Sequence, residues 1–77
     1  MSSDAVEICR AARERALEHG LSSPAIAAAG DVAGLRFLGQ PLHPARRELI
    51  APYGTVAWLN ENWPAILQRA GIAEDPR

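Results

Sequence analysis

The 77-residue sequence contains no lysine, only one cysteine, Cys9, and no long run of apolar residues. A single cysteine cannot form an internal disulfide bond, so we expect packing alone to hold the chain in a reducing compartment. A membrane span needs about 20 consecutive, mostly apolar residues, and no such stretch is present. Residues 1–4 lack the basic and apolar regions of a signal peptide. The sequence therefore predicts a cytoplasmic protein with no membrane contact.

An excess of basic charge is also missing. Eight arginines stand against nine acidic residues, which gives a formal net charge of −1. Proteins that bind nucleic acid usually carry a basic excess, because each phosphate contact uses a lysine or an arginine. The charge balance therefore argues against nucleic acid as the partner. Basic residues that are all arginine, together with frequent alanine, are typical of a GC-rich genome and favour a bacterial or phage source.

The length of the chain limits what it can build. Seventy-seven residues suffice for one domain, and 48% apolar residues predict a folded chain rather than a disordered one. We expect residues 1–77 to form a single domain with a frayed polar tail at 73–77. A chain of this size buries only about 60% of the surface that it exposes when unfolded. A protein partner or a second copy in a homodimer would add stability.

The first segment carries the clearest helix pattern. Asp4 is a suitable N-cap residue, and Gly20 followed by Leu21 is a typical helix end, so we expect a helix over 4–19. Small apolar residues recur at three- and four-residue spacing along one face: Ala5, Ile8, Cys9, Ala12 and Ala16. This face can hold another helix of the same chain, which we prefer, or its counterpart in a second copy.

Glycine and proline divide the rest of the sequence into short segments. Pro24 predicts the start of a helix over 24–29 that ends at Gly30, and a second short helix follows over 32–38. Pro44 predicts a helix through Ala51. Its inward-facing residues would be Ala45, Leu49 and Ile50.

Two capping residues complete the pattern. Thr55 is expected to cap a segment over 56–62, and Asn62 a last helix that ends at Gly71. The sequence thus predicts an all-α protein, a compact bundle of four to six short helices. The alternative is an α+β fold with a short hairpin near 35–38 and 55–59.

Catalytic and metal-binding motifs are absent. The sequence has one cysteine and two histidines, His19 and His43, without the spacing of a zinc site, and it has no phosphate-binding loop. Cys9 and His19 lie about 15 Å apart on one helix, too far to act as a nucleophile and its base. We predict that the protein is not an enzyme and needs no cofactor or metal.

Two arginines occupy an unusual position. If Pro44 begins a helix, Arg46 and Arg47 lie in its first turn, where the helix dipole disfavours cations by about 0.3–1 kcal/mol each. One interpretation is that Glu48, or another carboxylate brought near by folding, neutralises them. The other interpretation is a small electropositive site for an acidic partner or a phosphate.

The two tryptophans, Trp58 and Trp63, are five residues apart, which corresponds to about 140° around a continuous helix. Either the helix breaks before Pro64 and both rings enter the core, or one ring stays partly exposed beside Tyr53. Exposed tryptophan, tyrosine and arginine are enriched at protein interfaces. The predicted partner-binding residues are therefore Arg46, Arg47, Tyr53, Trp58 and Trp63.

These features favour a small non-enzymatic protein-binding regulator, inhibitor or accessory subunit that acts by surface contact. The alternative is a small helix-turn-helix-like DNA-binding regulator that uses residues 22–38. In that motif the second helix would offer the bases only Arg36 as a polar contact, and alignment on Gly30 places Arg36 where a buried apolar residue belongs.

Overall fold

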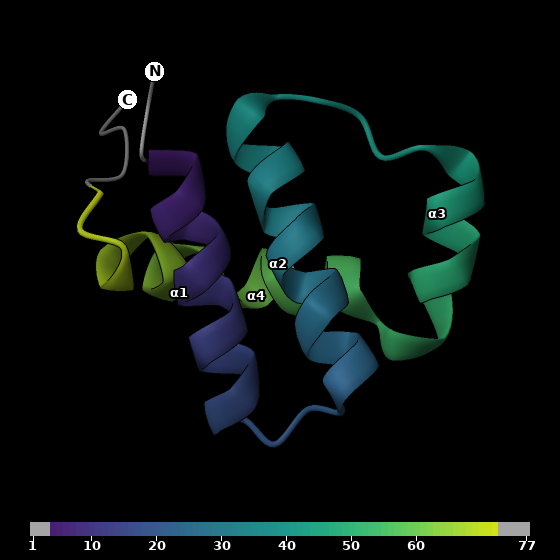
Figure 1. The fold of residues 1–77 in the computed structure, drawn as a ribbon, viewed down its shortest axis with the longest axis horizontal. Coiled ribbons are helices and arrows are strands. Elements are labelled where there is room, and N and C mark those ends of the chain that lie inside the picture. Colours follow the sequence, from purple (N-terminus) through teal and green to yellow (C-terminus); the bar gives the residue numbers. More distant parts are fainter. Residues whose placement is uncertain (1–3, 73–77) are drawn as a thin grey trace.

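A computed structural model describes residues 4–72, and all regular elements of this range are helical (Figure 1). The four α-helices are α1 (Asp4–Glu18), α2 (Ser23–Leu38), α3 (Pro44–Ile50) and α4 (Thr55–Arg69), and a short 3₁₀ turn, η1 (Ala51–Tyr53), joins α3 to α4. The all-α prediction is confirmed. The hairpin alternative is wrong, because residues 35–38 and 55–59 lie within helices. The tail at 73–77 lies outside the described residues.

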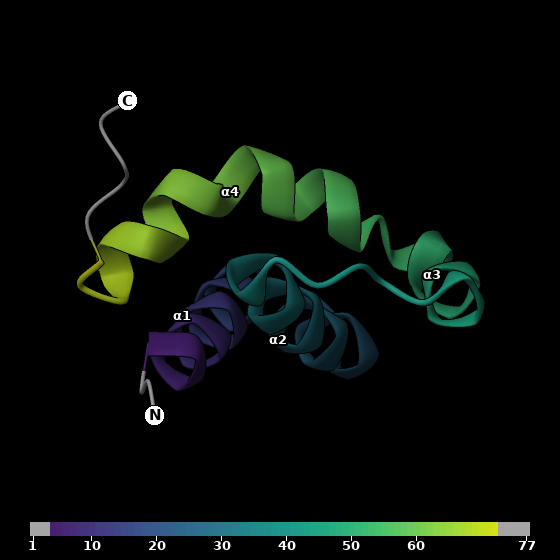
Figure 2. The ribbon, with the colours of Figure 1, turned by 90° about the horizontal axis from the view of Figure 1, so that it is seen from above.

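Helices α1 and α2 run side by side in opposite directions, and α4 crosses one face of this pair (Figures 1 and 2). Helix α3 lies beyond α2 at the end of the molecule where α4 begins. The α1–α2 contact is the most extensive in the structure, followed by the contacts of α4 with each of them. None of the helices within residues 4–72 has the length and apolar character that a membrane span requires.

Three helices end as their glycines predict. Gly20 has a φ of +76°, and the N–H of Leu21 donates to the carbonyl oxygen of Ala16 at 3.1 Å. Gly39 and Gly71 adopt the same left-handed conformation after α2 and α4. Because glycine has no Cβ, it enters this conformation without the penalty that other residues meet. The helix predicted over 4–19 is confirmed within one residue.

The prediction of two short helices over 24–29 and 32–38 is wrong. α2 continues through Gly30 and Gly34 without interruption. A Cβ added at Gly34 would lie 2.7 Å from the Sγ of Cys9, and one at Gly30 would lie 2.8 Å from the Cγ of Arg13. These glycines therefore allow α1 to approach α2 closely. Tertiary contact explains their presence in the helix, where glycine costs about 1 kcal/mol relative to alanine.

Alanines complete the close contact between α1 and α2. The buried alanines of the two helices are Ala11, Ala12, Ala16, Ala25, Ala28, Ala29 and Ala33. The small-residue face of α1 thus packs against α2 of the same chain, the arrangement preferred from the sequence. Larger core side chains come from all four helices: Ile8 of α1, Val32 of α2, Ile50 of α3, and Leu59, Ile66 and Leu67 of α4.

The break predicted before Pro64 does not occur. α4 contains Pro64 in its interior and arches over α1 and α2 (Figure 2). Proline removes one backbone hydrogen bond and bends a helix. Here burial of Leu59 on one side of the proline and Ile66 on the other keeps both halves of the helix on the same core.

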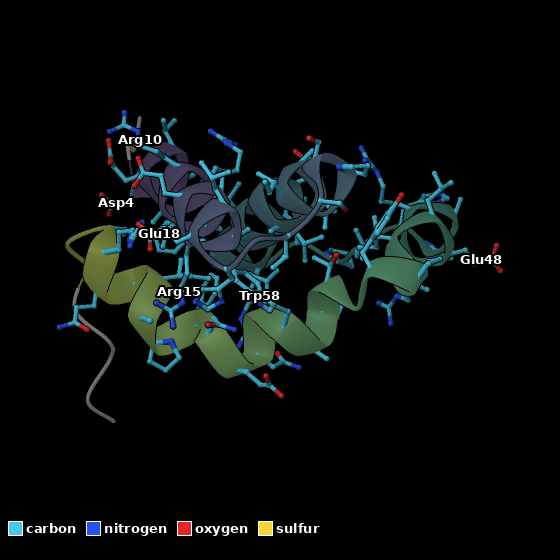
Figure 3. The ribbon with its side chains drawn as sticks, turned by 90° about the horizontal axis from the view of Figure 1, so that it is seen from below. Asp4, Arg10, Arg15, Glu18, Glu48 and Trp58 are labelled. Atoms are coloured by element: carbon cyan, nitrogen blue, oxygen red, sulfur yellow. The ribbon has the colours of Figure 1, made fainter. Side chains whose placement is uncertain are left out.

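Asn62 does not cap a helix, contrary to the sequence prediction. It is only 8% exposed, in the middle of α4, where its Oδ1 accepts a hydrogen bond from Nε of Arg15 at 2.7 Å. Its Nδ2 donates to the carbonyl oxygen of Trp58 at 2.8 Å. Figure 3 shows Arg15 and Trp58 at the junction of α1 and α4. Both polar ends of this buried amide are therefore satisfied, as burial requires.

A second polar contact joins the same two helices at the surface. Arg69 of α4 donates a hydrogen bond to the carboxylate of Glu18, and its guanidinium also lies 3.6 Å from Glu14. The hydrogen bond from Arg69 lowers the pKa of Glu18 below its ordinary value of 4.5. The charged form of Glu18 is thus favoured in the folded state.

Replacement of Gly34 tests the close contact of α1 and α2. We expect Gly34→Ala to lower the free energy of unfolding by up to about 2 kcal/mol, because overpacking costs about 1–3 kcal/mol and the gain in helix propensity is about 1 kcal/mol. In a Cys9→Ala background the Sγ is gone, and the same change should stabilise the protein. Urea unfolding of the four proteins measures both effects. Equal effects of Gly34→Ala in the two backgrounds would contradict the close contact.

The Glu18–Arg69 contact predicts a pH dependence. A carboxyl group whose pKa is lower in the folded state stabilises the protein above its unfolded pKa, and this contribution is lost as the pH falls through the folded pKa. We expect Glu18→Gln to lower the melting temperature at about pH 7 and to have no effect well below pH 4.5. Thermal unfolding across this range measures the difference. A difference that persists at low pH would show that the charge of Glu18 is not its cause.

Candidate functional site

Helix α3 stands apart from the other helices. Only Ile50 of its residues is buried, whereas Leu49 is 71% exposed. The prediction that Ala45 and Leu49 face inward is therefore wrong; Ala45 is exposed as well. The helix begins at Pro44, where Nδ1 of His43 accepts a hydrogen bond from the N–H of Ala45 at 3.1 Å, and it continues into η1. The separation of α3 from α2 leaves a depression between them.

This depression, which we call the α2–α4 groove, has a volume of about 250 Å³. It lies between α2, the connector that follows it, α3 and the first turns of α4. Its lining residues are Val32, Leu35, Arg36, Gln40, Leu42, Arg47, Val56 and Leu59. Pockets for drug-sized ligands measure about 300–1,000 Å³, so the groove has room for one or two side chains rather than for a large cofactor.

The groove combines an apolar lining with positive charge. Five of its eight lining residues are valine or leucine, two are arginine, and none is acidic. Arg36 lies over the ring of Trp63, with 4.6 Å from its Cζ to the ring centroid, and donates a hydrogen bond to Asn60. These two contacts fix the position of the Arg36 guanidinium at one side of the groove.

Arg47 differs from its neighbour Arg46. Arg46 pairs with Asp31 at 3.5 Å, an exposed contact worth at most about 1 kcal/mol. The Arg47 side chain has no hydrogen bond or ion pair with any residue in the range 4–72. Figure 3 shows Glu48 pointing outward from α3. Folding thus brings a carboxylate to Arg46 and leaves Arg47 unpaired beside the groove.

Neither tryptophan is fully buried. Trp58 and Trp63 are both half-buried on the continuous helix α4, so the arrangement with both rings in the core is wrong, and partial exposure extends to both rings rather than to one. His19 covers Trp58 edge-on, with 5.7 Å between the ring centroids, and Arg36 covers Trp63. A side chain from another segment, His19 or Arg36, therefore contacts each ring, and neither tryptophan lines the groove.

Among the predicted partner-binding residues, Arg47 alone lines the groove. Tyr53 lies on η1 and is 42% exposed, and it is not among the residues that line the groove. Sequence reasoning did not place Gln40 or Val56 at the site. The adjacent arginines Arg46 and Arg47 were visible in the sequence, but no local sequence pattern indicated that α3 would lie apart from α2.

A second hollow, of about 220 Å³, opens beside the groove at the start of α4. It is lined by Arg47, Ile50, Ala51, Gly54, Thr55, Val56 and Ala57, so Arg47 and Val56 belong to both depressions. Thr55 does not cap α4 as predicted. Gly54 occupies the N-cap position, and no side chain accepts a hydrogen bond there.

Within residues 4–72, no group of three histidine, cysteine, aspartate or glutamate side chains lies close enough to hold a metal ion. Comparison with known protein families, with curated proteins and with solved structures found no match. Any conclusion about function therefore rests on the residues of this chain.

The position of Arg47 predicts a small effect on stability. Because α3 ends at Ile50, Arg47 lies in its last turn rather than in the first turn expected from the sequence, and a cation there is favoured by about 0.3–1 kcal/mol. Arg47→Gln loses this contribution but no ion pair with a described residue, so we expect it to lower the free energy of unfolding by about 1 kcal/mol or less. Urea unfolding measures the change. A much larger destabilisation would mean that the native arginine supports the fold.

Proposed function

We propose that this chain is a small non-enzymatic binding protein, a regulator, inhibitor or accessory subunit, that holds a segment of a partner protein in the α2–α4 groove. The observation that carries the proposal is an apolar groove with two arginines and no acidic residue in its lining. The complementary segment presents an apolar side chain or two, together with a carboxylate for Arg47. A free Cys9 accords with the cytoplasm, where we propose that the protein acts.

The absence of a structural partner for Arg47 supports this reading. It lines the groove from the last turn of α3 and has no hydrogen bond or ion pair with any described residue. An arginine without a partner among the described residues is well suited to an external carboxylate, because its planar guanidinium can donate two parallel hydrogen bonds.

Charge also favours a different protein over a second copy of this chain. A two-fold interface places the same patch of both copies in contact. At the groove, such an interface would bring Arg47 and Arg36 of one copy near the arginines of the other. Like charges at an interface are unfavourable, so a homodimer through this surface is the less favoured arrangement.

The DNA-binding alternative loses its structural basis in α2. A helix-turn-helix over residues 22–38 needs a turn near Gly30, and α2 is helical across that position. The near-neutral net charge of the chain does not support DNA binding either. No described feature favours nucleic acid over an acidic protein segment.

Selection from a random peptide library displayed on phage tests the proposal. We expect the full-length chain to select peptides with one or two large apolar residues near aspartate or glutamate. Fluorescence polarisation should show at least tenfold weaker binding to Arg47→Glu and to Leu42→Arg, because these variants remove the charge and block the apolar lining.

Matched controls come from α1. Arg10→Glu reverses an exposed arginine, and Leu17→Arg replaces an exposed leucine on that helix, and both should bind as the wild type does. Arg47→Glu loses no ion pair with a described residue, so urea unfolding of this variant should show a folded protein, and its loss of binding cannot then be attributed to unfolding. Selection of basic peptides, equal binding by groove and control variants, or preferential binding of duplex DNA would overturn the proposal.

A further inference from the structure

The N-terminus of α4 lacks the partners that helices normally have there. The backbone N–H groups of Thr55, Val56 and Ala57 receive no acceptor from another backbone group or from a capping side chain of the described residues. No acidic residue lies in the first turn of α4. The N-terminus of a 15-residue helix therefore presents free donors and the positive end of the helix dipole.

A buried hydroxyl at the same place has no partner either. Thr55 is only 4% exposed, and its Oγ1 makes no hydrogen bond with any residue that the structure describes. A buried polar group without a partner costs about 1–3 kcal/mol. Thr55 lines the hollow at the start of α4, so its side chain borders the space that a ligand would occupy.

Arg47 supplies a full positive charge to this hollow. It lines the hollow together with Gly54, Thr55, Val56 and Ala57, and no carboxylate within residues 4–72 pairs with it. Backbone donors, a hydroxyl, a helix dipole and a guanidinium thus surround one space of about 220 Å³. This combination of groups recognises oxyanions, because each one interacts favourably with negative oxygen.

The α2 helix shows how an N-terminus is satisfied within the chain. There, Oγ of Ser22 accepts a hydrogen bond from the N–H of Ala25 at 3.4 Å. The equivalent acceptor for α4 would have to come from position 54, which is glycine and has no side chain to supply one. An external oxygen can take this place.

We infer that the N-terminus of α4, with Thr55 and Arg47, is an oxyanion-binding site that accepts a carboxylate or a phosphoryl group. The inference deepens the proposed function, since it supplies an anchor for the acidic group of the partner segment beside the groove. Apolar side chains of that segment would occupy the α2–α4 groove, and Arg47, which borders both depressions, would contact the anion.

The test uses simple anions and needs no partner protein. The full-length ¹⁵N-labelled chain is titrated with inorganic phosphate and, separately, with acetate at constant ionic strength, with chloride as the reference. We expect saturable shifts of the amide signals of Thr55, Val56 and Ala57. Saturation by acetate would assign the site to carboxylates, and saturation by phosphate alone would assign it to phosphoryl groups.

Variants distinguish a built site from a general effect of charge. Thr55→Val should weaken anion binding by about threefold to tenfold, the effect of one hydrogen bond, and should leave the free protein as stable or more stable. Thr55→Ser keeps the hydroxyl and should retain binding. Arg47→Gln should weaken binding by about tenfold or more, because it removes a charged donor. Shifts that do not saturate, shifts of equal size at the capped N-terminus of α2, or unchanged binding by Thr55→Val would overturn the inference.

The two proposals fail in different ways. If phosphate or acetate saturates the α4 amides but the library yields no groove-dependent peptide, the oxyanion site stands and the proposed protein partner is wrong. If acidic peptides bind through the groove and Thr55→Val binds them as tightly as the wild type does, the oxyanion site is wrong and the proposed function stands.

Discussion

The contact between α1 and α2 through small residues determines the rest of the structure. Gly34 lies against the Sγ of Cys9, and Gly30 lies against the side chain of Arg13, so neither position has room for a Cβ unless its neighbour moves. The buried alanines of both helices bring the two backbones close together along their length. A pair packed in this way buries little apolar area per residue, because alanine and glycine are small. Large side chains from elsewhere must therefore complete the core.

Helix α4 supplies these large side chains, and their packing determines how α4 crosses the α1–α2 pair. Leu59, Ile66 and Leu67 cover the α1–α2 pair, while Asn62 joins α1 through Arg15. With α4 committed to this face, the short α3 has only Ile50 to bury and remains at the edge. The α2–α4 groove is the space that results. The fold sets the positions of the two arginines in this groove. No acidic residue lines the groove to neutralise them.

Local signals in the sequence predicted some elements well. The helix over 4–19, the helix after Pro44 and the glycine-based ends at Gly20 and Gly71 depend on residues close together in the chain. The same kind of signal was misleading at Gly30 and Pro64. Glycine and proline weaken an isolated helix, but tertiary burial on both sides outweighs that local cost in α2 and α4. Only contacts between distant segments decide which outcome occurs.

The candidate site, too, could be predicted from local sequence signals only in part. The helix dipole marked Arg46 and Arg47 as unusual from sequence alone, and folding then separated them by pairing Arg46 with Asp31, fifteen residues earlier in the chain. The sequence could not show this pairing or the hollow at Thr55, because both depend on where α3 lies. The two tryptophans were notable in so short a sequence, yet each is contacted by a side chain from another segment of the chain.

Amide hydrogen exchange of the full-length chain, with and without a selected acidic peptide, tests the central claim most directly. Helix α3 has few contacts, so its amides should exchange quickly in the free protein. Binding in the α2–α4 groove should slow exchange in α3 and in the first turn of α4, and leave α1 unchanged. Protection centred on α1, or spread evenly over all helices, would contradict the assignment of the groove as the contact surface.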